Sequence, residues 1–278
     1  MLDLGQQRIA EDMGGDSYNL PGYFGKERWD YYRLNSHGHN LLLFANTSQS
    51  QGASANIVHF NMTAGQTTPP PSEELPAGNV TVDGWAIVDL TAAYAQSGGV
   101  TSARRGFVSL SGTACILIVD ELLYSADARP ANVTWQLHTR ADATVSAGNT
   151  SVTLTRGNTT AILALVPPTT VCPGFAGWSL LSLSTVLPDP PYDSAAGYYR
   201  LDGVITDPAA PLGAANRSPD VVSASPAALS VAAGGASLAA GCTNLTVALG
   251  DPATVAKFLD GTHRVRPLDD WTQAGPLR

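Results

Sequence analysis

Residues 132–166 read NVTWQLHTRADATVSAGNTSVTLTRGNTTAILALV, and this stretch decides the fold class. Apolar alternation and β-branched runs recur in NVTWQLHT, ATVSA, TSVTLT and TAILALV, with Gly or Asn residues between most of these runs. A period of two over a short run that is bounded by turn residues is typical of β-strands. The stretch therefore predicts consecutive strands joined by tight turns.

The same pattern extends in both directions along the chain. Upstream strands are predicted at NVTVDGWAIVDL (79–90), RRGFVSL (104–110) and TACILIVDELL (113–123). Downstream strands are predicted at WSLLSLSTV, YYRLDGVIT, LSVAAGG and NLTVALG, with surface loops at the proline-rich ranges 66–78, 186–197 and 207–220. Strands at this density predict an all-β chain, an antiparallel sandwich of the jelly-roll-like or supersandwich kind, with few or no helices.

The C-terminal part breaks this regularity. DPATVAKFL predicts a short helix with Asp251 as its N-cap, and the tail from Gly261 is expected to be irregular. We expect residues 1–166 to form the sandwich, and residues 167–278 either to continue it or to form a small C-terminal β region.

Charge and hydropathy restrict the partners. The formal net charge is −8, so attraction to nucleic acid or to an anionic membrane would lack a positive field. No apolar run reaches the roughly 20 residues that span a bilayer. The sequence predicts no nucleic-acid partner and no membrane partner.

Eight Asn-X-Ser/Thr triplets are the strongest compositional signal, and they predict a glycoprotein of the secretory pathway. Asn216 is set aside because Pro219 follows its triplet. The opening MLDLGQQRIAEDMGG has no signal-peptide pattern, so we expect an upstream segment. Cys115 is expected on a buried strand, whereas Cys172 and Cys242 could pair. The remaining predicted glycosylation sites are Asn46, Asn61, Asn79, Asn132, Asn149, Asn158 and Asn244.

Residues 2–44 combine aromatic side chains with cations, and two histidines follow. Aromatic rings stack on the apolar face of a pyranose, and guanidinium groups pair with carboxylate. An acidic polysaccharide is therefore the predicted partner, with Tyr23, Arg28 and Arg33 as substrate-binding residues. Trp29 is expected to be a core or edge aromatic, His138 a structural strand residue, and Arg104 and Arg105 a solvated strand edge.

The same stretch resembles the heparinase II/III-like polysaccharide lyases, which include oligoalginate lyases. The residues that carry the resemblance are Asp3-Leu4-Gly5, Asp16 to Phe24 (DSYNLPGYF), Arg28 to Arg33 (RWDYYR) and Gly38-His39-Asn40. It covers about residues 1–166. The resemblance implies a C-terminal β-sandwich that works with an N-terminal α-helical toroid and cleaves uronic-acid polysaccharides by β-elimination.

The resemblance also implies site residues. Tyr18 matches a loop tyrosine that points into the cleft, and it is the expected catalytic residue of this chain. Asp3 and His39 match two ligands of a structural zinc, whose third ligand would lie upstream of Met1; His37 is a poor substitute. Read from the residues alone, Asp3 and His39 would be an ordinary strand carboxylate and a hydrogen-bonded histidine.

Two functions from different classes remain open. The first is the sandwich part of a polysaccharide lyase, inactive alone because the helical domain with the main base and acid is missing. The second is a non-catalytic carbohydrate-binding or structural module of a secreted glycoprotein. Tight zinc binding and a cleft that works only in a longer protein favour the first. Sugar binding by this chain alone, without metal, favours the second.

Overall fold

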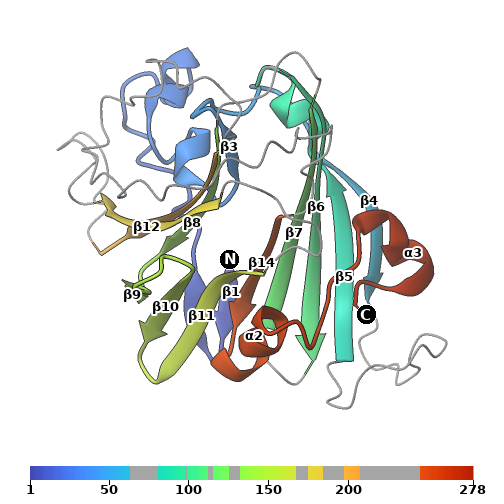
Figure 1. Ribbon diagram of the computed structural model, residues 1–278. Helices are drawn as coiled ribbons and strands as arrows, with labels where there is room; N and C mark the ends of the chain where they lie inside the picture. The colour runs from blue at the N-terminus through green and yellow to red at the C-terminus, as the bar shows by residue number, and fades with distance from the viewer. Residues whose placement is uncertain are drawn as a thin grey trace.

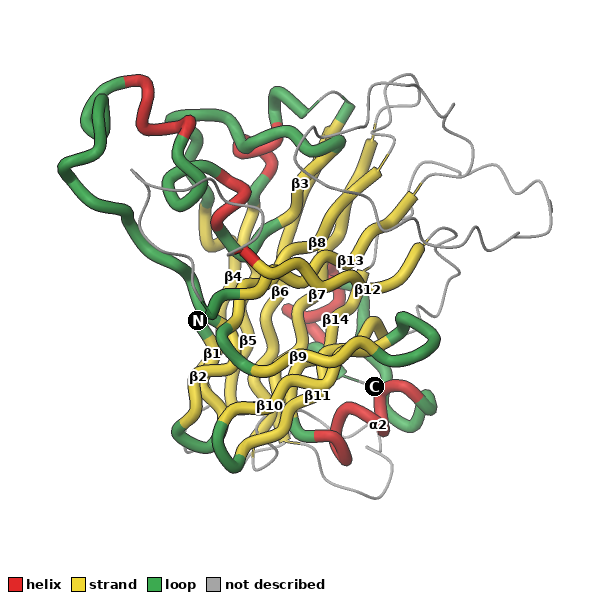
Figure 2. Tube along the Cα trace, turned by 90° about the vertical axis from the view of Figure 1, so that its left-hand side faces the viewer, coloured by secondary structure: helices red, strands yellow, loops and turns green. Residues whose placement is uncertain are grey.

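The computed structural model describes residues 1–62, 81–97, 99–111, 115–124, 132–166, 175–183, 197–206 and 245–277. Two large antiparallel sheets and a small N-terminal hairpin make up the described β structure (Figure 1, Figure 2). This confirms the all-β antiparallel prediction. Within the described residues, no helix is long and apolar enough to cross a membrane.

The larger sheet has eight strands in the order β4-β5-β6-β7-β14-β11-β10-β9. Every neighbouring pair in it is antiparallel. Its strands are β4 (Asn56–Met62), β5 (Thr81–Asp89), β6 (Val100–Ser111), β7 (Cys115–Tyr124), β9 (Asp142–Val145), β10 (Ser151–Arg156), β11 (Thr159–Val166) and β14 (Leu245–Gly250).

The smaller sheet has four antiparallel strands in the order β12-β13-β8-β3, and β1 pairs with β2 as a separate hairpin. Strands from after residue 166 belong to both large sheets, so the chain on either side of that point shares one architecture. The bounds are β1 (Leu2–Leu4), β2 (Gln7–Ala10), β3 (Leu42–Phe44), β8 (Asn132–Thr139), β12 (Phe175–Ser182) and β13 (Tyr199–Thr206).

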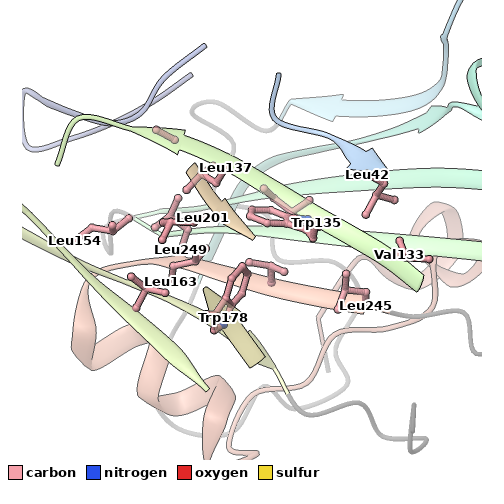
Figure 3. Packing of buried hydrophobic residues seen from close by; sticks show 14 of the residues in the cluster. Leu42, Val133, Trp135, Leu137, Leu154, Leu163, Trp178, Leu201, Leu245 and Leu249 are labelled. Carbon is pink, nitrogen blue, oxygen red and sulfur yellow. The ribbon is translucent and has the colours of Figure 1, made fainter. Parts of the chain in front are cut away.

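The main core lies between the two sheets (Figure 3). Val133, Trp135 and Leu137 alternate along β8 and face this core, because successive strand residues point to opposite sides. The Trp135 ring meets Trp178 of β12 edge to face, with centroids 5.6 Å apart. Offset and edge-to-face ring pairs add to the hydrophobic stabilisation that comes from burial.

A second core covers the other face of the larger sheet. Helix α2 (Pro252–Leu259) begins at Asp251, whose Oδ1 accepts hydrogen bonds from the backbone N–H groups of Ala253 and Thr254, at 3.1 and 3.3 Å, so the predicted cap is confirmed. Beyond it, Trp271 is buried against Gly106 of β6, where a Cβ would meet the indole at 2.5 Å.

The tail from Gly261 is less irregular than expected. It contains a 3-10 turn, η4 (Leu268–Asp270), and a short helix, α3 (Trp271–Ala274). The local sequence only weakly favours a helix in this tail. The helical turns form because Leu268 and Trp271 are buried on the larger sheet, and tertiary packing stabilises most short helices. The red C-terminal segment in Figure 1 follows this path beside the larger sheet.

Some predicted features lie outside the described residues. Cys172, Cys242 and LSVAAGG are among them, as are the loops at 66–78 and 207–220 and residues 186–196 of the third loop. Cys115 is described, and it is buried on β7 as predicted.

Candidate functional site

The candidate site is built on residues 16–34, which we call the aromatic segment. Residues 20–23 form a tight turn. The Tyr23 N–H donates to the Leu20 carbonyl at 3.1 Å, and Gly22 has φ 65°. Such a turn favours proline at its second position and requires glycine or asparagine at the following position of positive φ. The segment lies near β3, β8 and β12 in Figure 1.

The segment has a small apolar core of its own. Its four members are at most 8% exposed, and the Tyr31 hydroxyl donates to the Pro21 carbonyl at 2.6 Å. They are Leu20, Tyr23, Tyr31 and Leu34. This local core stabilises the conformation of the segment and so fixes the positions of the side chains around it.

Two large aromatic side chains next to this local core are exposed to solvent. Tyr18 is 70% exposed and Phe24 is 78% exposed. Both rings pack on buried Tyr23, each with centroids 5.0 Å away, and they lie 5.6 Å from one another. Grouped exposed aromatics on a soluble protein mark a binding surface more often than single ones do.

A cation is stacked next to these rings. The turn η1 (Lys26–Asp30) places the Arg28 guanidinium 5.4 Å from the Tyr23 ring centroid and 4.9 Å from that of Trp29. Cation–π contacts of this kind hold a guanidinium in place while its N–H groups stay able to bind carboxylate. We call Tyr18, Phe24, Arg28 and Trp29 the aromatic surface.

The structure thus brings some predicted residues together and separates others. Tyr18 and Arg28 lie on the aromatic surface, whereas Tyr23 is buried beneath it and Arg33 is half-buried farther along the segment. Sequence reasoning missed Phe24 and treated Trp29 as packing. No pattern in the sequence distinguishes the exposed rings from the buried Tyr23 and Tyr31.

A buried polar network lies next to the segment. The Tyr32 hydroxyl is 2.9 Å from His138 Nε2, and Arg200 Nη1 donates to the same hydroxyl at 3.3 Å. The other imidazole nitrogen, His138 Nδ1, is 3.0 Å from Asn40 Oδ1. Arg200 also pairs with Asp202 at 2.9 Å. This network was not predicted, because its members come from three distant parts of the chain.

Burial sets the protonation of the two central groups. It lowers the pKa of His138 to about 3 and raises the pKa of Tyr32 to about 12. Nearby Arg200 also lowers the pKa of His138. Both side chains are therefore neutral around pH 7, where they form one neutral hydrogen bond.

The two predicted zinc ligands contact different side chains. Asp3 pairs with Arg8 on the exposed β1–β2 hairpin, and this hydrogen bond lowers the pKa of the Asp3 carboxyl. His39 Nδ1 instead lies 2.7 Å from Oδ2 of Asp12, a carboxylate that sequence reasoning did not single out. The described residues contain no cluster of three His, Cys, Asp or Glu side chains that could hold a metal. The Asp3–His39 pair does not fit a zinc centre as described, and zinc stays a prediction.

Comparison with known protein families gives one match that includes the candidate site. The model of the family "Heparinase II/III-like, C-terminal" matches residues 1–180. The chain belongs to this family. The match makes the protein a member of a polysaccharide lyase family, and it includes the whole aromatic segment as well as His39 and His138. No curated protein matches the chain.

Proposed function

We propose that this heparinase II/III-like chain is the β-sandwich part of a lyase that cleaves uronic-acid polysaccharides by β-elimination. The aromatic surface is its contact with the acidic sugar. The observation that carries the proposal is the Arg28 guanidinium stacked between the rings of Tyr23 and Trp29, beside the exposed rings of Tyr18 and Phe24.

The chemistry of a uronate suits this surface. Exposed rings stack on the apolar face of the pyranose, and a stacked guanidinium pairs with the carboxylate through two parallel N–H groups. β-Elimination also requires that this carboxylate charge be neutralised while a base removes the neighbouring C5 proton. Arg28 supplies the neutralisation, and the exposed Tyr18 phenol can donate to a sugar oxygen.

The base is expected from outside this sandwich. Tyr32 and His138, whose pKa values are shifted far from neutral pH, are uncharged and hydrogen-bonded to one another, so neither suits removal of the C5 proton. We therefore propose that the chain acts together with an α-helical domain and is inactive alone. Lyase activity would be followed by the ultraviolet absorbance of the unsaturated uronate that β-elimination produces.

A non-catalytic carbohydrate-binding module is the second candidate. The observation that favours it is that exposed rings and a stacked cation, the groups expected of a sugar-binding surface, gather on one segment. Both candidates require sugar binding at the same residues. Unsaturated product from a form of the protein that includes the helical domain supports the lyase, and binding without product from that form supports the module.

Replacing Arg28 with glutamine is expected to weaken binding of an oligo-alginate by roughly 10- to 100-fold. A hydrogen-bonded charge contact contributes about 1.5–3 kcal/mol, which converts to that range. Titration calorimetry measures the change, with Lys26→Gln as a control that removes the same charge from the same turn. An oligosaccharide with reduced carboxyl groups should bind both variants alike. Equal loss in the two variants on the acidic sugar would contradict the assignment of Arg28.

We further propose a secreted glycoprotein with a subset of the predicted sites in use. Asn149 is exposed in the turn between β9 and β10, and Asn158 is exposed in the turn between β10 and β11. Asn46 and Asn61 are also exposed. Asn132 differs, because it begins β8 and its side-chain oxygen is buried. Asn79 and Asn244 lie outside the described residues.

Glycopeptide mapping of the protein made in a eukaryotic secretory host tests this division. Glycan is expected at Asn149 and Asn158, and none is expected at Asn132, whose half-buried side chain begins β8 between the neighbouring strands β13 and β3. Full occupancy of Asn132 in folded protein would contradict the division. The same map reports on the exposed sites Asn46 and Asn61.

A further inference from the structure

The outer face of the smaller sheet carries buried polar side chains in adjacent strands. Gln136 and His138 of β8 point away from the main core, and their register partners on β13 are Asp202 and Arg200. Gln136 is 1% exposed, His138 is 0% exposed and Asp202 is 7% exposed. Burial of so many polar groups is costly unless each has a partner. This face therefore depends on what covers it.

Tyr32 of the aromatic segment is part of that cover. Its ring meets the His138 ring edge to face, with centroids 5.9 Å apart, and its hydroxyl lies between His138 and Arg200. The direction of each bond is determined. Asn40 Oδ1 accepts from the His138 backbone N–H at 2.7 Å and from Nδ1 at 3.0 Å, so Nε2 is left as an acceptor for the Tyr32 O–H.

Tyr32 is also tied closely to the residues that would contact sugar. It follows η1 by two residues, and it lies four residues after Arg28 in the chain. The Tyr31 N–H donates to the Arg28 carbonyl at 3.3 Å, so little slack separates the turn from Tyr32. A shift of Tyr32 away from the sheet would move Arg28 and Trp29 with it.

We propose that Tyr32 and His138 are positioning residues of the aromatic surface. Their hydrogen bond docks the aromatic segment on the smaller sheet and thereby sets where the Arg28 guanidinium is held. The consequence for sugar affinity rests on the proposed function, whereas the docking itself does not.

The loss of one hydrogen bond from this network is expected to favour undocking of the aromatic segment. Among the described residues, Nε of Arg200 is buried without a hydrogen-bond partner. Removing the Tyr32 hydroxyl would leave His138 Nε2 as a second such atom. Water that enters when the segment lifts can satisfy both of them, so the undocked state gains stability relative to the docked one.

The test follows the position of the aromatic segment through the fluorine signal of Trp29. Tryptophan is replaced by 5-fluorotryptophan, and the fluorine resonance of Trp29 is identified by its disappearance in Trp29→Phe. In Tyr32→Phe this resonance is expected to shift or broaden, while those of Trp85, Trp135, Trp178 and Trp271 stay in place. Affinity for the oligo-alginate is expected to fall roughly tenfold.

Two kinds of control keep the result specific. Tyr199→Phe makes the same change on β13 one residue from Arg200, on the opposite face of the strand, and should leave both readouts unchanged. His138→Leu should behave like Tyr32→Phe. His138→Gln, whose amide oxygen can accept the Tyr32 hydrogen bond, should restore the Trp29 signal.

Each outcome decides one of the two claims. An unmoved Trp29 resonance in both Tyr32→Phe and His138→Leu overturns the positioning role. A moved resonance supports it, even where the wild-type chain binds no oligo-alginate, and in that case the proposed sugar contact is what fails. A moved resonance with unchanged sugar affinity overturns the link between docking and binding.

Discussion

Replacing Asp120 with alanine is expected to lower the free energy of unfolding by about 3–5 kcal/mol, because it leaves a buried guanidinium without its counter-charge. Asp120 is 1% exposed and Arg105 is 6% exposed. Two hydrogen bonds join them, from Arg105 Nε at 2.6 Å and from Nη2 at 3.0 Å. Such paired contacts satisfy a guanidinium that water no longer reaches.

The loss should spread beyond the pair. Arg105 Nη1 donates to the Asn40 carbonyl at 3.2 Å, and the Asn40 side chain in turn accepts from His138. An Arg105 side chain that turns toward water would give up the Asn40 contact as well. The Arg105–Asp120 ion pair therefore also stabilises the backbone at Asn40, shortly before β3.

Urea unfolding of Asp120→Ala, with the midpoint converted to free energy, gives the measurement. Asp269→Ala is the matched control, because Asp269 pairs with neighbouring Arg104 but its side chain is 77% exposed. Exposed pairs contribute about 0–1 kcal/mol, so that variant should unfold close to the wild type. Similar losses in the two variants would contradict a special cost of the buried pair.

Arg105 also shows where sequence reasoning reached its limit. The expectation of a solvated strand edge is wrong for Arg105, because its partner lies on the neighbouring strand and both are covered. A strand pattern gives the two faces of β6, but it does not say which face another segment of the chain will cover. Here the described covering contact comes from Asn40, 65 residues earlier in the chain.

Local features of the fold were predicted well. The strand NVTWQLHT coincides with β8, and Asp251 caps α2 as expected. Both depend on the side-chain period or the capping group of a few neighbouring residues. The described C-terminal turns were missed because their stability comes from packing on a distant strand.

The candidate site was predicted in part for the same reason. The composition of residues 2–44 indicated a sugar surface, but it did not separate exposed Phe24 from buried Tyr23. The family resemblance paired His39 with Asp3, whereas the carboxylate beside His39 is Asp12. How the chain folds back determines which of two acids contacts a histidine, and a single sequence carries no direct signal of it.

Replacing Gly38 with alanine is expected to cost about 3 kcal/mol and to lift the aromatic segment from the smaller sheet. Gly38 ends the turn η2 (Ser36–Gly38), and it is buried. A Cβ at this position would lie 2.3 Å from the Tyr32 carbonyl oxygen and 2.9 Å from the Arg33 Cα. Both are backbone atoms, so no side chain can turn aside to make room.

Gly25→Ala provides the control within the same segment. Its added Cβ would meet Glu27 Oε2 at 2.6 Å, but that atom ends a flexible, exposed side chain, and the nearest backbone atom is 3.3 Å away. We expect Gly25→Ala to unfold close to the wild type and to keep the Trp29 fluorine resonance in place. Both variants lengthen a glycine by the same methyl group, so their difference measures the backbone clash.

The location of the damage is the more informative part of the Gly38→Ala result. Tyr32 lies on one side of the clash, and the carbonyl that is displaced is its own. The Trp29 resonance should therefore move as it does in Tyr32→Phe, while Trp135 and Trp178 keep their signals because they pack on one another in the main core. A loss of stability without movement of Trp29 would mean that the clash is relieved toward β3, and that the aromatic segment is held by more than its contact with His138.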